Sequence, residues 1–365
     1  MYLENDRKFS TENFLTYGAL APPNFVFSST LPFAYFFNMN YGFWKKLKKP
    51  FFALAPMADV TDASFRRIIA LHGKPDVMWT EFVSADGLCS PGRKILLHDL
   101  KFTDAERPIV AQLFTSNPEK MREASALCQK LGFDGIDINM GCPDGSIEKQ
   151  RAGAAMINDS KRAREIIRAA KDGAPRLPIS VKTRIGYNKN EIKTWIPEIL
   201  AEGVAALTIH CRTRKEMSLV PARWEHVREV MALRDKISPE TLIIGNGDVK
   251  DLADAKNKAR EFGVDGVMLG RGIFGNPWLF SALHTKDEKS VSPNLPETLK
   301  ALILHTKLFE KLLISVKSFA HMKKHFKSYV HGFDNAKELR VQLMEAKKAD
   351  EVEDIVKQFL KNGSI

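Results

Sequence analysis

The segment Gly135-Ile136-Asp137-Ile138-Asn139-Met140-Gly141-Cys142-Pro143 is the best starting point for the architecture of this chain. It begins as a short apolar strand and continues directly into a polar turn that contains glycine, presents a cysteine and ends in proline. The carboxyl end of a parallel strand is where an α/β barrel keeps its chemistry. An isolated cysteine is, however, more often a small buried core residue. The pattern of the remaining chain distinguishes the two interpretations.

The remaining chain repeats one unit from Phe51 onward: a strand-like run, a polar or glycine-containing loop, then an amphipathic helical stretch such as 118–131 or 160–171. Eight strands are predicted, at Phe51–Ala55, Asp76–Glu81, Pro108–Phe114, Gly135–Asn139, Ile179–Arg184, Ala206–His210, Leu242–Asn246 and Gly266–Gly270. Eight such units within about 230 residues fit the α/β class as a (β/α)8 TIM barrel. An open doubly wound sheet usually has fewer strands.

Three parts of the chain differ in texture. Residues 1–45 contain phenylalanines interleaved with prolines, a pattern typical of neither helix nor strand, and we interpret them as an extension preceding an alternative start at Met39. Residues 46–284 contain the barrel units. Residues 293–365 are helical in pattern, with breaks at Gly332 and around Ala349-Asp350, which predicts a small bundle of three or four helices.

The charge balance of the 365-residue chain is basic, with 55 Lys+Arg against 44 Asp+Glu. A net charge of +11 suits either a polyanionic partner or simply a basic soluble enzyme. Its distribution favours the polyanion, because four lysines and three histidines occur between Lys317 and His331 with no acid among them. An ordinary solvated helix face is the alternative explanation of that run.

The cysteines and apolar runs argue against several classes of protein. Cys89, Cys128, Cys142 and Cys211 have neither CxxC nor Cys/His spacing, so we expect no metal site and no disulfide framework, as in a reducing cytoplasm. The apolar run near the N-terminus is short and interrupted by proline, so we expect no membrane span. It also lacks the features of a signal peptide.

In a barrel the carboxyl ends of all strands converge, so the residues that follow them can be taken together as one site. The first strand is followed by Pro56-Met57-Ala58, a turn whose backbone groups can hold a flat heteroaromatic edge. The other strand ends supply Gln112, Asn139, Cys142, Lys182, Arg184, His210, Arg212, Asn246-Gly247-Asp248 and Gly270-Arg271-Gly272.

The last two of these groups indicate a phosphate site. Glycines after the seventh and eighth strands let backbone N–H groups approach a phosphate, and Arg271 can add a charge-assisted bond. Lys182 is suited to stabilise negative charge on a reduced isoalloxazine. Each feature also has a plainer explanation: Asn246-Gly247-Asp248 as a turn, and Lys182 as an interior ion pair with Asp137.

Taken together, these residues resemble one family, the bacterial-type tRNA-dihydrouridine synthases, which are FMN enzymes with a barrel and a helical C-terminal domain. The resemblance covers roughly residues 51–280, with a weaker similarity in 323–332. The matching motifs are Leu54-Ala55-Pro56-Met57-Ala58-Asp59, Thr80-Glu81-Phe82, Gln112, Asp137-Ile138-Asn139-Met140-Gly141-Cys142-Pro143, Val181-Lys182-Thr183-Arg184, His210-Cys211-Arg212-Thr213, Gly245-Asn246-Gly247-Asp248, Gly270-Arg271-Gly272 and Gly275-Asn276-Pro277-Trp278.

The resemblance implies reduction of the C5=C6 bond of specific uridines in the tRNA D-loop to 5,6-dihydrouridine. FMN would be the cofactor, NADPH or NADH the reductant, and Cys142 the proton donor to C5. We expect a cytoplasmic enzyme and take a monomer as the default. The implied cofactor contacts are Pro56, Met57, Ala58, Gln112, Lys182, His210, Asn246, Gly247, Asp248, Gly270 and Arg271. The implied substrate contacts are Asn139, Arg184, Arg212, Lys323, Lys324 and Lys327, the last three through tRNA phosphates.

Two other functions remain open from the sequence. An FMN barrel acting on a free pyrimidine, of the dihydroorotate or dihydropyrimidine dehydrogenase kind, would explain the barrel but neither the helical tail nor the surplus positive charge. An RNA-binding or chaperone-like protein that has lost catalysis would explain the charge. The presence of Cys142, Lys182 and Arg271 argues against that second alternative.

Overall fold

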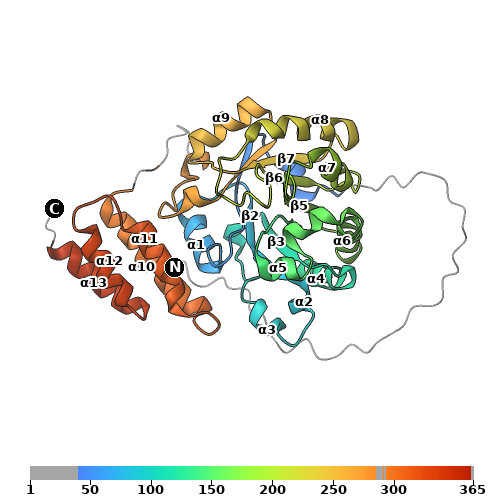
Figure 1. Cartoon of the computed structure of the whole chain (residues 1–365). Coiled ribbons are helices and arrows are strands. Elements are labelled where there is room, and N and C mark those ends of the chain that lie inside the picture. The colour runs from blue at the N-terminus through green and yellow to red at the C-terminus, as the bar shows by residue number, and fades with distance from the viewer. Residues whose placement is uncertain (1–39, 285–290, 292, 363–365) are drawn as a thin grey trace, which may run out of the picture. The chain divides into compact units, whose positions relative to one another are not determined.

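The computed structural model of the chain describes residues 40–284, 291 and 293–362, which belong to one compact unit (Figure 1). The predicted extension therefore lies outside the described residues up to and including Met39. Within the described part, no helix combines the length and the apolar composition needed to cross a membrane.

The barrel is a single sheet of eight parallel strands that closes on itself, with the order β1-β8-β7-β6-β5-β4-β3-β2. The two edge strands meet through a parallel bridge between Ala53 and Val77, so the predicted (β/α)8 barrel is confirmed. The strands are β1 Phe51–Leu54, β2 Met78–Ser84, β3 Ile109–Phe114, β4 Gly135–Met140, β5 Ile179–Arg184, β6 Ala206–His210, β7 Leu242–Asn246 and β8 Gly266–Leu269.

The second strand differs from its prediction, which placed it at Asp76–Glu81. The Asp76 carboxylate accepts a hydrogen bond of 2.7 Å from the Phe52 N–H, and the Asp76 N–H donates to the Phe52 carbonyl. Asp76 therefore fastens β1 from outside the strand. The pairing with β3 continues as far as Ser84, which places Glu81 inside the strand rather than at its end.

Helices surround the barrel between the strands (Figure 1). Asn117 illustrates how the sequence delimits them: its side chain caps α4, Pro118 takes the first position, and Gly132 ends the helix in the left-handed conformation. The barrel helices are α1 Ala63–His72, α2 Ala85–Leu88, α3 Arg93–Leu96, α4 Pro118–Leu131, α5 Gly145–Lys149, α6 Ser160–Gly173, α7 Ile192–Leu200, α8 Val227–Ile237 and α9 Leu252–Phe262.

A short 3-10 turn, η2 (Gly42–Lys46), closes the amino-terminal end of the barrel. Trp44 is buried there, with its ring 5.7 Å from that of Phe51 and 6.0 Å from that of Trp79. Tyr41 is buried in the same apolar cluster. Residues 41–45 thus pack as part of the barrel, whereas the sequence pattern assigned them to the extension.

The C-terminal residues form a helical bundle, as predicted, with α10 Leu295–Leu313, η8 Phe319–Met322, α11 Lys323–Tyr329, α12 Ala336–Glu345 and α13 Ala349–Asn362. Gly332 lies between α11 and α12, where a break was expected. The bundle packs against α1, and the ring of Phe65 lies 5.5 Å from His305 and 5.2 Å from His325. We call this contact between the barrel and α10–α11 the junction.

Candidate active site

A cleft of about 620 Å³ opens where β7, β8 and β1 end. We call the carboxyl ends of the strands, with the loops that follow them, the mouth of the barrel. Predicted residues that line the cleft are Pro56, Met57, Lys182, His210, Arg212, Asn246, Gly247, Asp248, Gly270 and Arg271. The lining also includes Ala55, Ser218, Val249, Lys250 and Gly272, of which only Ala55 and Gly272 belonged to a recognised motif.

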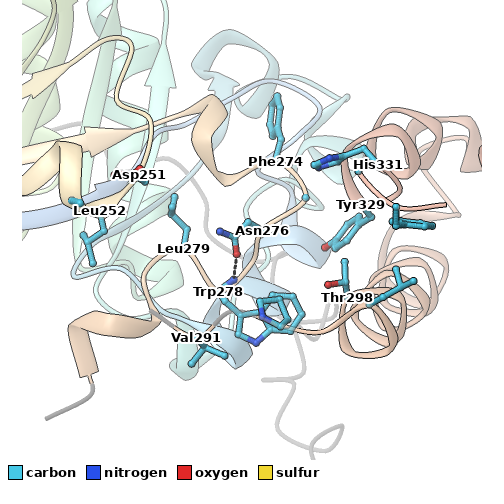
Figure 2. Close-up of a pocket in the computed structure, with 16 residues that line it drawn as sticks. Asp251, Leu252, Phe274, Asn276, Trp278, Leu279, Val291, Thr298, Tyr329 and His331 are labelled. Atoms are coloured by element: carbon cyan, nitrogen blue, oxygen red, sulfur yellow. Dashed lines mark hydrogen bonds between the residues drawn. The ribbon is translucent and has the colours of Figure 1, made fainter. Parts of the chain in front are cut away.

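A second cleft is larger, at about 710 Å³, but it lies at the junction (Figure 2). Figure 2 shows Phe274, Asn276 and Trp278 from the segment after β8 facing Tyr329 and His331 from the bundle. None of the predicted site residues is among the described residues that line it. Size alone therefore does not locate the chemistry, and the mouth is the stronger candidate.

Glycines shape the floor of the mouth cleft. Gly247 has a φ of +126°, and a Cβ there would lie 2.8 Å from the Cβ of Ala222. A Cβ on Gly272 would lie 2.5 Å from the carbonyl oxygen of Lys250. Neither position accepts a side chain without movement of its surroundings, so the backbone itself forms the surface that a ligand would meet.

Asp248 organises the cations of this cleft. Its carboxylate accepts hydrogen bonds from Arg212 Nη2, from Arg271 Nη2 at 3.0 Å and from the Ala222 N–H at 2.9 Å. Although partial burial opposes the charge, Arg212 and Arg271 hold the pKa of Asp248 below its ordinary value. Asp248 therefore orients two guanidinium groups and does not itself suit contact with a phosphate.

His210 is neutral in this setting. Burial, together with the cations Arg184 and Lys182, lowers the pKa of His210 well below 6.5. Arg212 Nη1 lies 3.1 Å from His210 Nε2, and a guanidinium can only donate, so Nε2 accepts. The ring proton then resides on Nδ1, which makes His210 a neutral donor through that nitrogen.

Lys182 presents its ammonium group to the cleft. Its Nζ has no hydrogen-bond or ion-pair partner among the described residues. The Asp137 carboxylate instead accepts from Gln112 Nε2 and Ser180 Oγ, both at 2.6 Å, so the interior ion pair with Asp137 considered from the sequence does not form. Burial and the nearby Arg184 lower the pKa of Lys182 to about 8.

Asn139 holds the turn after β4, which carries Cys142, through hydrogen bonds. Its Oδ1 accepts from the N–H groups of Gly141 at 3.1 Å and Cys142 at 2.9 Å, and its Nδ2 donates to Gln112 Oε1. Gln112 was predicted to contact cofactor and Asn139 to contact substrate. Both are buried, and these bonds support the cysteine turn, while their contacts with cofactor and substrate stay predictions.

Arg184 supports the same turn from the side. Its Nε donates to the Gly141 carbonyl at 2.7 Å, and its Nη1 donates to the carbonyls of Thr213 and Met217, each at 3.0 Å. Burial lowers the pKa of Arg184 to about 10, which leaves it cationic at neutral pH. Arg184 therefore ties the cysteine turn to the loop after β6.

Cys142 is a partly exposed thiol with a fixed backbone. The Ala154 N–H donates to its carbonyl at 2.9 Å, and a Cβ on Gly153 would lie 2.7 Å from that carbonyl oxygen. Burial raises the pKa of the thiol, while Arg184 and Lys182 act in the opposite direction. Because Lys182 lines the cleft and also acts on Cys142, the thiol and the cleft belong to one mouth.

The predicted lysines of the bundle lie apart from the cleft. Lys324 and Lys327 on α11 are exposed and Lys323 is half-buried, and none of them lines the mouth cleft. The basic run 317–331 is also less free than the sequence suggests, because Lys317 pairs with barrel carboxylates. The run has no acidic residue in its own sequence, but the fold places Glu81 and Asp99 of the barrel next to Lys317.

The fold and mouth define a class: a TIM-barrel enzyme with a glycine-lined, cationic cleft at its last two strands and a protonated thiol at its fourth. The sequence of residues 53–364 matches the family model described as dihydrouridine synthase (Dus). The chain belongs to the dihydrouridine synthase family. The matched range includes the helical bundle, which the alternative hypothesis of an enzyme acting on free pyrimidines does not explain.

Curated proteins give the same assignment. Over 324 residues, the chain is 42% identical to the "probable tRNA-dihydrouridine synthase 2" of Bacillus subtilis (strain 168), covering 88% of this chain and 97% of that one. It is 41% identical to the "probable tRNA-dihydrouridine synthase" of Staphylococcus aureus (strain MRSA252), covering 88% and 96%. Histamine dehydrogenase from Rhizobium sp. 4-9 is a distant structural neighbour, with a TM-score of 0.47 and 13% identity over 70% of this chain and 48% of that one. So distant a likeness adds nothing to the assignment.

Proposed function

We propose that this chain reduces the C5=C6 bond of a uridine in the D-loop of tRNA to 5,6-dihydrouridine, with Cys142 as the proton donor. The observation that carries this proposal is a protonated thiol held by Asn139 and Arg184 at the rim of a cationic cleft. Membership of the dihydrouridine synthase family supports it. The names of the similar bacterial proteins support tRNA as the substrate.

The cleft fits a flavin mononucleotide. Gly247 and Gly272 line the cleft with their backbone, against which a phosphate would lie, and Arg271 supplies a charge beside it. Lys182, which has no ion-pair partner among the described residues, offers its ammonium group to the electron-rich edge of the ring. The side-chain oxygen of Asn246 stays available because its Nδ2 donates to the Met268 carbonyl. Pro56, Met57 and Ala58 would hold the ring edge. The flavin, reduced by NADPH or NADH, would supply the hydride that adds to C6 of the uracil.

Cys142 would complete the reduction. Addition at C6 leaves negative charge shared between C5 and the C4 carbonyl of the uracil, and C5 then needs a proton from a positioned acid. The raised pKa of Cys142 keeps the thiol protonated at neutral pH, and proton transfer leaves a thiolate. Arg184 and Lys182 would stabilise that thiolate until the partly exposed sulfur takes a proton from water.

The RNA would be bound by both parts of the protein. We assign residues 46–284 as the catalytic FMN-binding domain and residues 293–365 as the tRNA-binding domain. A uridine in folded tRNA is partly stacked, so it must leave the stack to reach the mouth. Arg212 would act near the cofactor phosphate and the substrate, and Lys323, Lys324 and Lys327 would contact RNA phosphates.

The test uses purified protein, NADPH and unmodified bulk tRNA. We expect flavin absorbance and a gain of about two mass units on uridine, as the addition of hydride and a proton requires. Flavin without turnover of tRNA, together with turnover of a free pyrimidine, would contradict the proposal. A colourless protein that binds tRNA without modifying it would also contradict the proposal, and would favour an RNA-binding protein that has lost catalysis.

A further inference from the structure

The junction contains one ionic cluster that reaches into the mouth. Lys317 lies between α10 and η8, and its side chain is only 15% exposed. Its Nζ lies 2.8 Å from Glu81 Oε2, 3.0 Å from Asp99 Oδ1 and 3.9 Å from Asp59 Oδ1. His321 approaches the same Asp59 carboxylate from η8, at 3.7 Å. All of these carboxylates belong to the barrel.

Glu81 links this cluster to the turn that was predicted to hold the cofactor. While its Oε2 receives Lys317, its Oε1 accepts a 2.5 Å hydrogen bond from the N–H of Asp59. Asp59 directly follows Pro56-Met57-Ala58 and has a φ of +55°, a conformation that residues other than glycine seldom adopt. The bond that Glu81 accepts therefore fixes the backbone at Asp59, the residue of the turn with the least favourable conformation.

That turn reaches the cleft directly. Pro56 and Met57 line it, and the sulfur of Met57 lies 3.7 Å from the position that a Cβ on Gly270 would take. Thr61 fastens the other side of the turn, because its Oγ1 accepts from the Met57 N–H at 2.9 Å. The turn is thus held by local bonds from Val60 and Thr61 to Met57 and, through Glu81, by the link to Lys317.

We propose that Lys317 of the helical bundle is a positioning residue for the flavin-holding turn Pro56-Met57-Ala58, acting through Glu81 and the N–H of Asp59. This proposal rests on the proposed function, since it assumes that the turn holds a flavin. It assigns the bundle a part in cofactor binding in addition to RNA binding. The physical reason is the cost of burying a carboxylate without its partner.

The electrostatics agree with the geometry. Glu81 is 5% exposed, and burial raises its pKa to about 7, while Lys317 acts to lower it. Burial opposes the charge of Lys317, yet Glu81 and Asp99 raise its pKa. Without Lys317, Glu81 would take up a proton or turn toward water, and either change would disturb the bond that it accepts from Asp59.

The test compares Lys317→Met with Lys311→Met in the full-length protein. Lys311 is an exposed residue of α10 with no ion pair among the described residues, so its variant makes the same change of charge without touching the cluster. We expect Lys317→Met to weaken FMN binding to the apoprotein by about tenfold or more, while the KM for tRNA changes less. Lys317→Arg should restore most of the affinity, and Lys311→Met should bind FMN as wild type does.

Two further measurements keep the outcome decisive. Glu81→Gln removes the stranded charge, so Lys317→Met combined with Glu81→Gln should bind FMN more tightly than Lys317→Met alone. Hydrogen exchange at the Asp59 amide should accelerate in Lys317→Met apoprotein, a result that needs neither flavin nor RNA. Unchanged FMN affinity and unchanged exchange, with tRNA binding lost, would overturn the proposal and make Lys317 an RNA or docking contact. Absence of dihydrouridine formation by the wild type would instead refute the function and leave the exchange result valid.

Discussion

The mouth of the barrel and the junction bury polar groups in different ways. At the mouth, Arg184 and Arg212 donate to backbone carbonyls, and Arg212 also donates to Asp248. These bonds leave Lys182 and the Nδ1 of His210 for a ligand. At the junction, His305 is fully buried with neither ring nitrogen bonded among the described residues. The mouth is a prearranged polar surface, whereas the junction combines an apolar contact that buries histidines with the separate ionic cluster of Lys317.

This difference implies that mutations will act on separate properties. Changes at the mouth should alter turnover at nearly constant stability, because those groups surround the reacting atoms. Changes in the apolar part of the junction should alter stability and its dependence on pH, whereas changes at Lys317 should act on the flavin-holding turn. A mouth variant that mainly lowered stability, or a variant in the apolar part of the junction that mainly lowered turnover, would break the comparison.

The largest effect is expected for Cys142→Ala. Removal of the proton donor should lower kcat for dihydrouridine formation by about 10²–10⁴-fold. Flavin absorbance should be retained, because Cys142 does not line the cofactor cleft. Single-turnover assays with prereduced enzyme separate the loss of chemistry from slow reduction by NADPH. Wild-type turnover in Cys142→Ala would show that another group donates the proton.

The raised pKa of Cys142 also predicts a pH profile. The proton donor is active while protonated, so turnover limited by this step should hold through neutral pH and fall only as pH rises past the raised pKa. Cys142→Ser, whose hydroxyl does not titrate in this range, should lack that alkaline limb. An identical alkaline limb in both proteins would assign it to another group, for which Lys182 is the nearest candidate.

A smaller effect is expected for Asn139→Ala, because Asn139 acts through the turn and does not deliver the proton itself. Loss of its bonds to the Gly141 and Cys142 N–H groups should lower kcat by about tenfold to a hundredfold. Asn117→Ala is the matched control, since Asn117 also accepts two backbone N–H bonds but caps α4. That control should cost about 1 kcal/mol of stability and leave kcat unchanged.

At the junction, His305→Leu should change the dependence of stability on pH. Burial lowers the pKa of His305 to about 3, below the ordinary value near 6.5. Between these values the unfolded chain binds a proton that the folded chain does not, so stability is lost as pH falls from 6.5 toward 3. His305 should contribute about 1.4 kcal/mol per pH unit in that range, and His305→Leu should remove this slope in denaturant titrations.

His325 tests the same idea from the facing helix. Its ring lies 4.6 Å from that of His305, and burial with the proximity of His305 lowers its pKa well below 6.5. A combined His305→Leu and His325→Leu variant should lose the pH dependence of stability that each of the two histidines contributes. Unchanged acid sensitivity in the combined variant would mean that the acid response arises elsewhere, with His210, whose pKa burial also lowers well below 6.5, as the first group to test.

The barrel could be predicted because each strand and the loop that follows it form a local sequence pattern. The candidate site could then be placed because the strand ends of a barrel converge. The sequence could not show how the residues of the site hold one another in place. Gln112, Asn139 and Asp248 were expected to touch cofactor or substrate, which stays a prediction, and only the fold reveals their hydrogen-bond partners within the protein. It also missed Ser218 and Lys250 in the cleft, which have no distinguishing local signal.

The basic run 317–331 shows the same limit at the junction. The sequence presents its lysines as equivalent, but Lys317 pairs with Glu81 across 236 positions of the chain, while Lys327 is exposed on α11. Such a long-range pair cannot be inferred from neighbouring residues. We therefore expect a change at Lys317 to weaken FMN binding and a change at Lys327 to weaken tRNA binding, the latter being the smallest effect.

Lys327→Met should weaken tRNA binding by about threefold to tenfold and lower the salt dependence of log Kd by about one unit, the signature of one lost phosphate contact. FMN affinity should not change. Lys161→Met on α6 is the control, because Lys161 is also exposed but belongs to a barrel helix packed between α4 and α7. Equal salt dependence in the two variants and the wild type would make Lys327 an ordinary solvated residue. Lys323 and Lys324 of α11 and the mouth cations Arg212 and Arg271 would then be the RNA contacts to test next.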